Sequence, residues 1–166
     1  MKTLFDFPIT MKLKSIQFSE YDGKPEEWRL EDCTLSQINL IVGKNATGKT
    51  RTLNVIATLT DLLTGNMKPK DNSGNFTVIF DNDGMEIIYR LIFSNYEVIK
   101  EELKQGDKLL LQRQEDGKGE IFVEQLGNAL KFQPPPDELA VVSRRDAIQH
   151  PFLEHLYSII KFFVTP

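Results

Sequence analysis

The chain has 166 residues, of which 40% are hydrophobic and 27% charged, so its composition is that of one folded domain and excludes a disordered protein. Its formal net charge of −4 predicts no general attraction to nucleic acid or to an anionic membrane, so a nucleic-acid contact would need a local face or other parts of a larger assembly. The single cysteine, Cys33, excludes an internal disulfide and is expected to be a small core residue in a reducing compartment.

The N-terminal part is expected to hold a short extension, residues 1–10, followed by two strands. No run approaches the roughly 18 apolar residues of a membrane helix, and Asp6 and Pro8 interrupt the short apolar stretch near the start. We therefore expect a cytoplasmic protein without a membrane partner. Ile16 and Phe18 share one face of a strand over 11–18, and a turn at 22–25 leads to a second strand that begins at Trp28.

Residues 38–63 read as strand, glycine loop and helix. The segment 38–42 is short, apolar and β-branched, which predicts a buried strand, and 51–63 carries apolar residues over more than one stripe, which predicts a largely buried helix ending at Gly65. Between them, 43–50 fits G-x-x-x-x-G-K-[ST], the phosphate-binding loop, in the context that this motif requires.

The chemistry of this loop predicts a nucleotide site. Gly43 and Gly48 allow tight backbone turns, and successive N–H groups over 46–50 can form an anion-binding nest at the positive end of a helix. Lys49 is expected to reach the β- and γ-phosphates, and the Thr50 hydroxyl to ligate Mg²⁺. The predicted nucleotide-binding residues are Gly43, Lys44, Asn45, Ala46, Thr47, Gly48, Lys49, Thr50 and Arg51.

The centre of the chain changes to a period of two. Alternating residues over 76–80, the turn 81–84 and a returning strand over 86–93 predict a hairpin, and 96–100, 108–112 and 120–124 continue it as an antiparallel meander. The predicted fold class is therefore α/β: a P-loop NTPase lobe, residues 11–133, whose phosphate-loop strand and helix carry an antiparallel β layer.

The C-terminal part, residues 134–166, is expected to begin with a stiff spacer of three prolines. The segment 139–142 fits a strand or the start of a helix equally well. A last helix is expected from Pro151, with an apolar face that needs a partner, so we expect self-association or poor solubility through this end. That face consists of Phe152, Leu156, Ile159, Ile160 and Phe163.

The loop and its surroundings resemble ABC-type ATPase heads. Asn45, Ala46 and Thr47 fit the G-x-N-[GA]-[ST]-G-K-[ST] variant of the loop in that group, which includes chromosome-maintenance and recombination-repair ATPases and the bacterial overcoming-lysogenization-defect and abortive-infection ATPases. Residues 11–18 are similar to the opening strand of such heads, and 98–103 with 109–113 to the antiparallel arm of the bacterial subgroup. The resemblance implies ATP and Mg²⁺ as ligands and a partial, N-terminal half of a head.

Other candidate residues have simpler interpretations. Asp81 ends an apolar run as a Walker B carboxylate would, and 81–84 spells the D-x-x-G of GTPases, but a hairpin turn fits it better. Asp137-Glu138 follows prolines rather than a strand, and Arg144-Arg145 is expected to be a solvated basic pair. Gln133 and Gln149 lie where the resemblance places a Mg²⁺-contacting glutamine, whereas His150 and His155 have no further metal ligands near them in sequence.

The chain lacks a signature sequence of the Leu-Ser-Gly-Gly-Gln kind, an apolar strand ending in Asp-Glu and a switch histidine. Our first hypothesis is therefore an ATP-binding half of an ABC-type ATPase of a DNA-repair or phage-defence system. Its hydrolysis would need a C-terminal half or a partner ATPase chain, a second copy included, and the isolated chain would be inactive. The alternatives are a small P-loop kinase or GTPase that uses Asp81, and a non-catalytic interaction domain.

Overall fold

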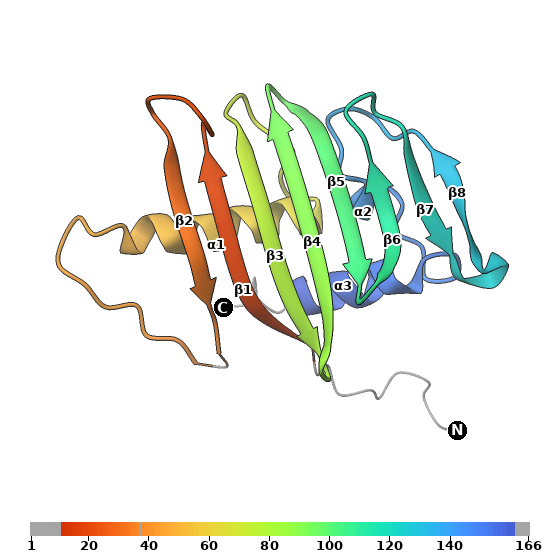
Figure 1. Ribbon diagram of the computed structural model, residues 1–166, viewed down its shortest axis with the longest axis horizontal. Helices are drawn as coiled ribbons and strands as arrows, with labels where there is room; N and C mark the ends of the chain where they lie inside the picture. Colours follow the sequence, from red (N-terminus) through yellow and green to blue (C-terminus); the bar gives the residue numbers. More distant parts are fainter. Residues whose placement is uncertain (1–10, 37, 162–166) are drawn as a thin grey trace.

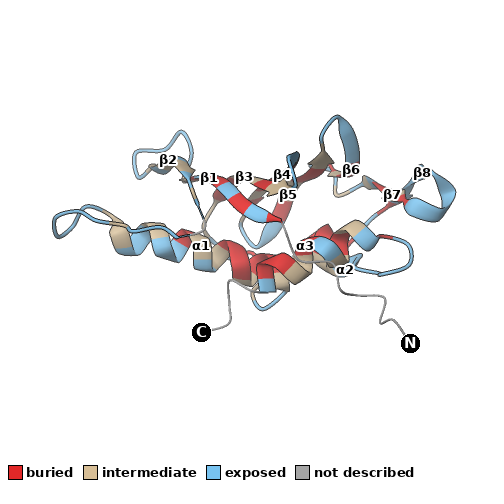
Figure 2. Ribbon diagram, turned by 90° about the horizontal axis from the view of Figure 1, so that it is seen from below, coloured by how far each residue is buried: buried red, intermediate tan, exposed pale blue. Residues whose placement is uncertain are grey.

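The computed structural model describes residues 11–36 and 38–161, which form one broad β-sheet with helices on a single face (Figures 1 and 2). The sheet has eight strands in the order β2-β1-β3-β4-β5-β6-β7-β8, and every neighbouring pair is antiparallel. Apart from β1, which lies between β2 and β3, the strands follow one another as a meander. Their bounds are β1 Lys12–Glu20, β2 Trp28–Thr34, β3 Gly74–Asn82, β4 Met85–Ser94, β5 Glu97–Gln105, β6 Lys108–Arg113, β7 Gly119–Val123 and β8 Asn128–Phe132.

The central strands form because apolar residues alternate along them. In β3, residues 74, 76, 78 and 80 are buried and those between them are half-buried, and β4 repeats the pattern from Ile87 to Phe93. The register pairs like with like, since Phe76 lies opposite Leu91 and Val78 opposite Tyr89. The strands therefore share one apolar face, and that face needs a covering layer.

Three helices supply this layer: α1 Lys49–Thr64, α2 Ala140–Ser143 and α3 Pro151–Lys161. A short 3₁₀ turn, η1 Glu124–Leu126, joins β7 to β8. Helix α1 ends at Gly65, which adopts φ +81° and donates its N–H to the Leu62 carbonyl, as the sequence predicted. The ambiguous segment 139–142 forms the start of α2.

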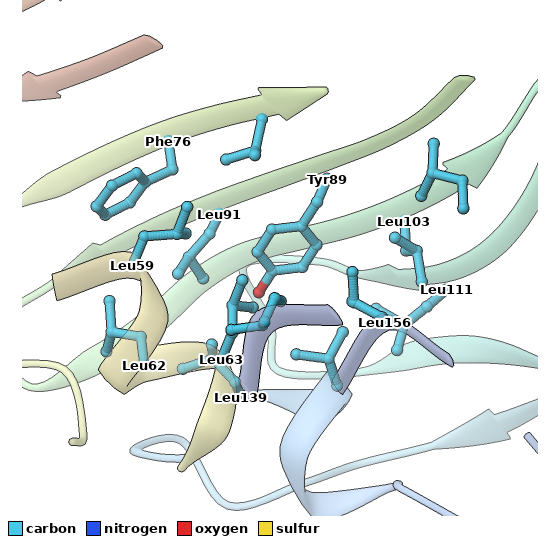
Figure 3. Close-up of a cluster of buried hydrophobic side chains, with 14 of the residues drawn as sticks. Leu59, Leu62, Leu63, Phe76, Tyr89, Leu91, Leu103, Leu111, Leu139 and Leu156 are labelled. Carbon is cyan, nitrogen blue, oxygen red and sulfur yellow. The ribbon is translucent and has the colours of Figure 1, made fainter. Parts of the chain in front are cut away.

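The core lies between the sheet and these helices (Figure 3). Phe76, Tyr89 and Leu103 project from the strands toward Leu59 of α1 and Leu156 of α3, and all of these side chains are buried. Helix α1 contributes only one face, because Leu53 in its first half is 55% exposed. The expectation that the helix is largely buried is therefore wrong for the N-terminal half of α1.

The predicted fold class, an α/β P-loop lobe built as a partial ABC-type head, is also wrong. The described residues form an all-antiparallel sheet with few helices, and residues 38–42 form no strand. Parallel strands are stable when both of their faces are covered, and here the helices cover only one face of the sheet. What the sequence did predict within this sheet is the antiparallel hairpin of β3 and β4 around residues 81–84 and its continuation as a meander through β5, β6 and β7.

The expectation that the last helix, α3, exposes an apolar face is also wrong. Leu156, Ile159 and Ile160 are at most 3% exposed, because α3 packs against α1 and the sheet. Phe152 is half-buried, and Phe163 lies outside the described residues. The apolar face of α3 is therefore part of the core and is not an exposed patch through which copies would associate. The boundary predicted at residue 134 stays a prediction, although residues on both sides of it share this core.

A buried polar cluster fixes the segment that leads into α2. The fully buried Glu101 carboxylate accepts hydrogen bonds from the Tyr89 hydroxyl (3.0 Å) and from the N–H groups of Ala140 (2.6 Å) and Val141 (3.0 Å). Directly opposite Glu101 in the register lies Arg113, which is 1% exposed. Its guanidinium donates to the carbonyls of residues 138 (2.7 Å) and 135 (3.1 Å). Two buried charges of opposite sign thus hold the backbone of 135–141 against the sheet.

Candidate functional site: the loop before α1

The loop 43–48 leads into α1 through two residues in the left-handed region. Ala46 has φ +65° and Gly48 has φ +88°, and α1 begins at the next residue, Lys49. The first N–H groups of a helix have no carbonyl partner within the helix. Within the described part of the chain, no side chain caps this end of α1 and its first turn carries no acidic residue. The exposed positive end of a sixteen-residue helix is therefore left for an external anion.

Lys49 folds back across the loop. Its Nζ donates to the Gly43 carbonyl and to the Lys44 carbonyl, each at 2.6 Å. The Thr47 hydroxyl also donates to the Lys44 carbonyl, at 2.8 Å. The ammonium group is thus held at the mouth of the loop by two neutral carbonyls. A phosphate oxygen can take their place, because an anionic acceptor binds the ammonium group more strongly than a neutral carbonyl does.

Gly43 is required by the closeness of this turn. A Cβ built on Gly43 would lie 2.6 Å from the Thr47 hydroxyl oxygen, which is shorter than any real contact of that kind. A side chain at 43 would therefore displace the Thr47 hydroxyl from its hydrogen bond to the Lys44 carbonyl, which also accepts from Lys49. Thr50 is exposed in the first turn of α1, so its hydroxyl is open to an incoming ion.

Arg51 points away from the loop toward the end of β1. Its guanidinium lies 2.9 Å from the Glu20 carboxylate and stacks over the Trp28 ring, with 4.2 Å between the guanidinium carbon and the ring centroid. Glu20 also accepts a hydrogen bond from the Asn72 side-chain amide, at 2.9 Å. The only tryptophan of the chain therefore reports on the surroundings of Arg51.

A cavity of about 200 Å³ begins at Arg51 and follows α1 toward the sheet. The helix wall carries Arg51, Asn54 and Thr58, spaced so that they share one face of α1. The opposite wall is the loop after α1, with Lys70 and Asn72. Its floor is apolar and consists of Phe18, Val55, Leu62, Met67 and Phe93.

The other candidate carboxylates have structural partners. Asp81 lies at the end of β3, where its side chain accepts the Gly84 N–H at 3.0 Å and closes the hairpin turn. Asp137 and Glu138 pair with Lys68 at 2.7 and 3.2 Å, and this pairing lowers the pKa of the Asp137 carboxyl. Among the described residues, no group of three or more His, Cys, Asp or Glu side chains is arranged to hold a metal ion.

The remaining candidates have structural contacts. Arg144 lies over the Phe132 ring and Arg145 stacks on Tyr157, 3.7 Å from its centroid, so the basic pair is bound within the chain. The buried His150 ring places Nδ1 2.9 Å from the Phe122 carbonyl. Gln133 and His155 are exposed, and the backbone carbonyl of Gln149 accepts the Glu124 N–H. Cys33 is a free, half-buried thiol.

Sequence reasoning named Arg51 but missed the cavity beside it. The signal that could have revealed it is the polar stripe Arg51, Asn54 and Thr58 on a helix whose other positions are rich in Leu, Val and Ile. Glu20, Trp28 and Asn72 had no such signal, because they come from three separate segments that the fold brings to one end of α1.

The segment before the loop is the most exposed apolar stretch of the described chain. Ile38, Leu40 and Val42 are 90%, 85% and 75% exposed, and they alternate as strand residues do. Figure 1 shows this segment running outside the sheet, beyond β2. Within residues 11–36 and 38–161, no helix has the length and apolar character needed to cross a membrane.

Comparison with protein-family models, curated proteins and solved structures finds no match to this chain.

Proposed function

We propose that the loop 43–50 binds the phosphates of ATP together with Mg²⁺. The observation that carries this proposal is the uncapped N-terminus of α1, which follows Ala46 and Gly48 in left-handed conformations and has the Lys49 ammonium held at its mouth. A fixed positive end, open N–H groups and a mobile cation are what a triphosphate requires.

The residues present fit this ligand. Lys49 exchanges its two carbonyl partners for phosphate oxygens, and Thr50 offers an exposed hydroxyl to the magnesium ion that accompanies ATP. The ion neutralises phosphate charge, and the remaining coordination positions are filled by phosphate oxygens and water. Glu20 and Trp28 hold the Arg51 guanidinium away from the loop, so Arg51 borders the phosphate site and is not assigned a phosphate contact.

We further propose that hydrolysis needs a second polypeptide, a partner ATPase chain of a DNA-repair or phage-defence system. The exposed row of Ile38, Leu40 and Val42 supports this, because such a stretch gains about 25 cal/mol per Å² of apolar surface when a partner covers it. The kinase or GTPase alternative loses its support, since β3, which carries Asp81, is antiparallel to its neighbours and no strand forms at 38–42.

Titration of the purified chain with Mg²⁺-ATP, followed by calorimetry and by Trp28 fluorescence, tests the proposal. We expect saturable binding by the wild type and loss of binding in Lys49→Ala. The matched control is Lys131→Ala, which removes an exposed lysine from β8 at the opposite edge of the sheet. Identical titration curves for wild type and Lys49→Ala would refute the proposal.

The same samples test the need for a partner. We expect no phosphate release above background from the isolated chain, because among the described residues the candidate carboxylates Asp81, Asp137 and Glu138 are engaged elsewhere and do not orient an attacking water at the loop. Steady turnover that disappears in Asp81→Asn would contradict this and restore the kinase or GTPase hypothesis.

A further inference from the structure

The cavity beside α1 has the size of a ring system and not of a whole nucleotide. Pockets that enclose complete small ligands measure roughly 300–1,000 Å³, whereas a cavity of about 150 Å³ accepts benzene. At about 200 Å³, the cavity from Arg51 to Thr58 takes a fused heterocycle and leaves the rest of its ligand outside.

Its lining has an apolar floor and a polar rim, and the rim also carries the charged side chains of Glu20, Arg51, Lys68 and Lys70. The floor is formed by Phe18, Val55 and Phe93, which offer apolar and aromatic faces to a flat ring. The rim carries the amide of Asn54 and the hydroxyl of Thr58, which can pair with the polar edge of that ring. An apolar floor with a few convergent polar groups is typical of sites for heterocycles.

Glu20 holds the two walls together at the end nearest the phosphate loop. One carboxylate oxygen accepts from Arg51 on the helix wall, and the other accepts from Asn72 on the opposite wall. The helix rises about 1.5 Å per residue, so Asn54 lies only about 6 Å along the axis from Thr50. The rim of the cavity at Asn54 therefore lies within the length of a sugar of Thr50, measured along the helix axis.

We propose that this cavity binds the purine base of the nucleotide, with the floor stacking on the ring and Asn54 and Thr58 facing its polar edge. This assignment rests on the proposed phosphate site. It concerns the base of the nucleotide, which the phosphate loop does not contact. It predicts that the chain distinguishes a nucleoside triphosphate from a bare triphosphate chain, which the loop alone does not do.

The experiment compares Mg²⁺-ATP with Mg²⁺-tripolyphosphate on the full chain by calorimetry. We expect the wild type to bind ATP about tenfold or more tightly than tripolyphosphate, since stacking and ring burial contribute only to ATP. Thr58→Phe fills the cavity and should weaken ATP binding by a similar factor while leaving tripolyphosphate binding unchanged. Ala57→Phe is the matched control, because residue 57 is the exposed neighbour on α1 and does not line the cavity.

The outcomes separate this inference from the proposed function. A wild type that binds neither ligand refutes the phosphate site itself. A wild type that binds both equally leaves the phosphate site standing and refutes the base site, and this comparison needs no variant to fold. Equal weakening of both ligands in Thr58→Phe, or equal effects of Thr58→Phe and Ala57→Phe on ATP, also overturns the base site.

Discussion

Removing the Glu101 carboxylate should be one of the most damaging single changes in this chain. In Glu101→Ala, the Tyr89 hydroxyl and the N–H groups of Ala140 and Val141 lose their common acceptor inside the core. Each buried donor without a partner costs about 1–3 kcal/mol. Three such donors would together cost about 3–9 kcal/mol, whereas Arg113 keeps its two carbonyl acceptors. Because water entering the space left by the carboxylate relieves part of this cost, we expect a loss of about 4 kcal/mol in the free energy of unfolding.

The neighbouring Glu102→Ala is the matched control. Glu102 faces the other side of the sheet, where its side chain, 9% exposed, lies 2.6 Å from Arg90 and 3.5 Å from Lys104, and both cations are more than a third exposed. Ion pairs whose cation stays in contact with water contribute about 0–1 kcal/mol, and among the described residues the Glu102 carboxylate accepts no buried backbone N–H whose bond would be lost. Urea unfolding followed by far-UV circular dichroism and Trp28 fluorescence measures both variants. Equal losses in Glu101→Ala and Glu102→Ala, with unchanged m-values, would refute the reasoning.

Two further predictions concern the same core. Burial raises the pKa of the Glu101 carboxyl above 4.5, so its contribution to stability is complete below 4.5 and is lost as pH rises through the folded-state pKa. The uncharged Glu101→Gln should therefore gain in unfolding free energy relative to wild type as pH rises, and urea titrations showing a pH-independent difference would contradict this. Ile160→Ala should cost about 2–5 kcal/mol because its side chain is buried, whereas Leu40→Ala should change the melting transition little.

The sequence predicted those elements whose apolar period and terminal turn residues are both present within one short segment. The hairpin of β3 and β4 follows from strict alternation on both sides of Asp83-Gly84, and both turn residues adopt positive φ as such a turn needs. Helix α1 follows from a glycine at each end and apolar periodicity between them. In both cases the local pattern and the packing agree, and no distant partner is needed to decide the structure.

The predictions that were wrong concern segments whose structure depends on a neighbouring strand. Residues 38–42 have the composition of a buried strand, but a strand needs a partner for its N–H and C=O groups, and none of the described strands lies beside it. Conversely, β8 has little apolar pattern and forms because β7 offers it a paired edge. The α/β class was inferred from the loop, and a loop of eight residues does not determine the sheet around it.

The candidate site also contains residues that the sequence predicted and residues that it did not. The loop residues and Lys49 were predictable because they are contiguous and their chemistry needs that order. Glu20, Trp28 and Asn72 were not, because only the pairing of β1 with β2 and the return of the chain after α1 bring them to Arg51. The charged Glu101 would be placed in solvent by its type alone, and its acceptor role depends on residues about 40 positions away.

The hydrogen bonds of Glu101 and Arg113 with segment 135–141, here called the clamp, determine which substitutions this segment tolerates. From 135 to 141, the hydrogen bonds of Glu101 and Arg113 go only to main-chain groups, two N–H groups and two carbonyls. They hold the path of the segment without selecting its side chains, so many sequences can follow that path at little cost to the clamp. Proline is the exception at 140 and 141, because it has no N–H to donate. Variation across relatives should therefore be free at the exposed positions of this segment, with proline excluded at those two.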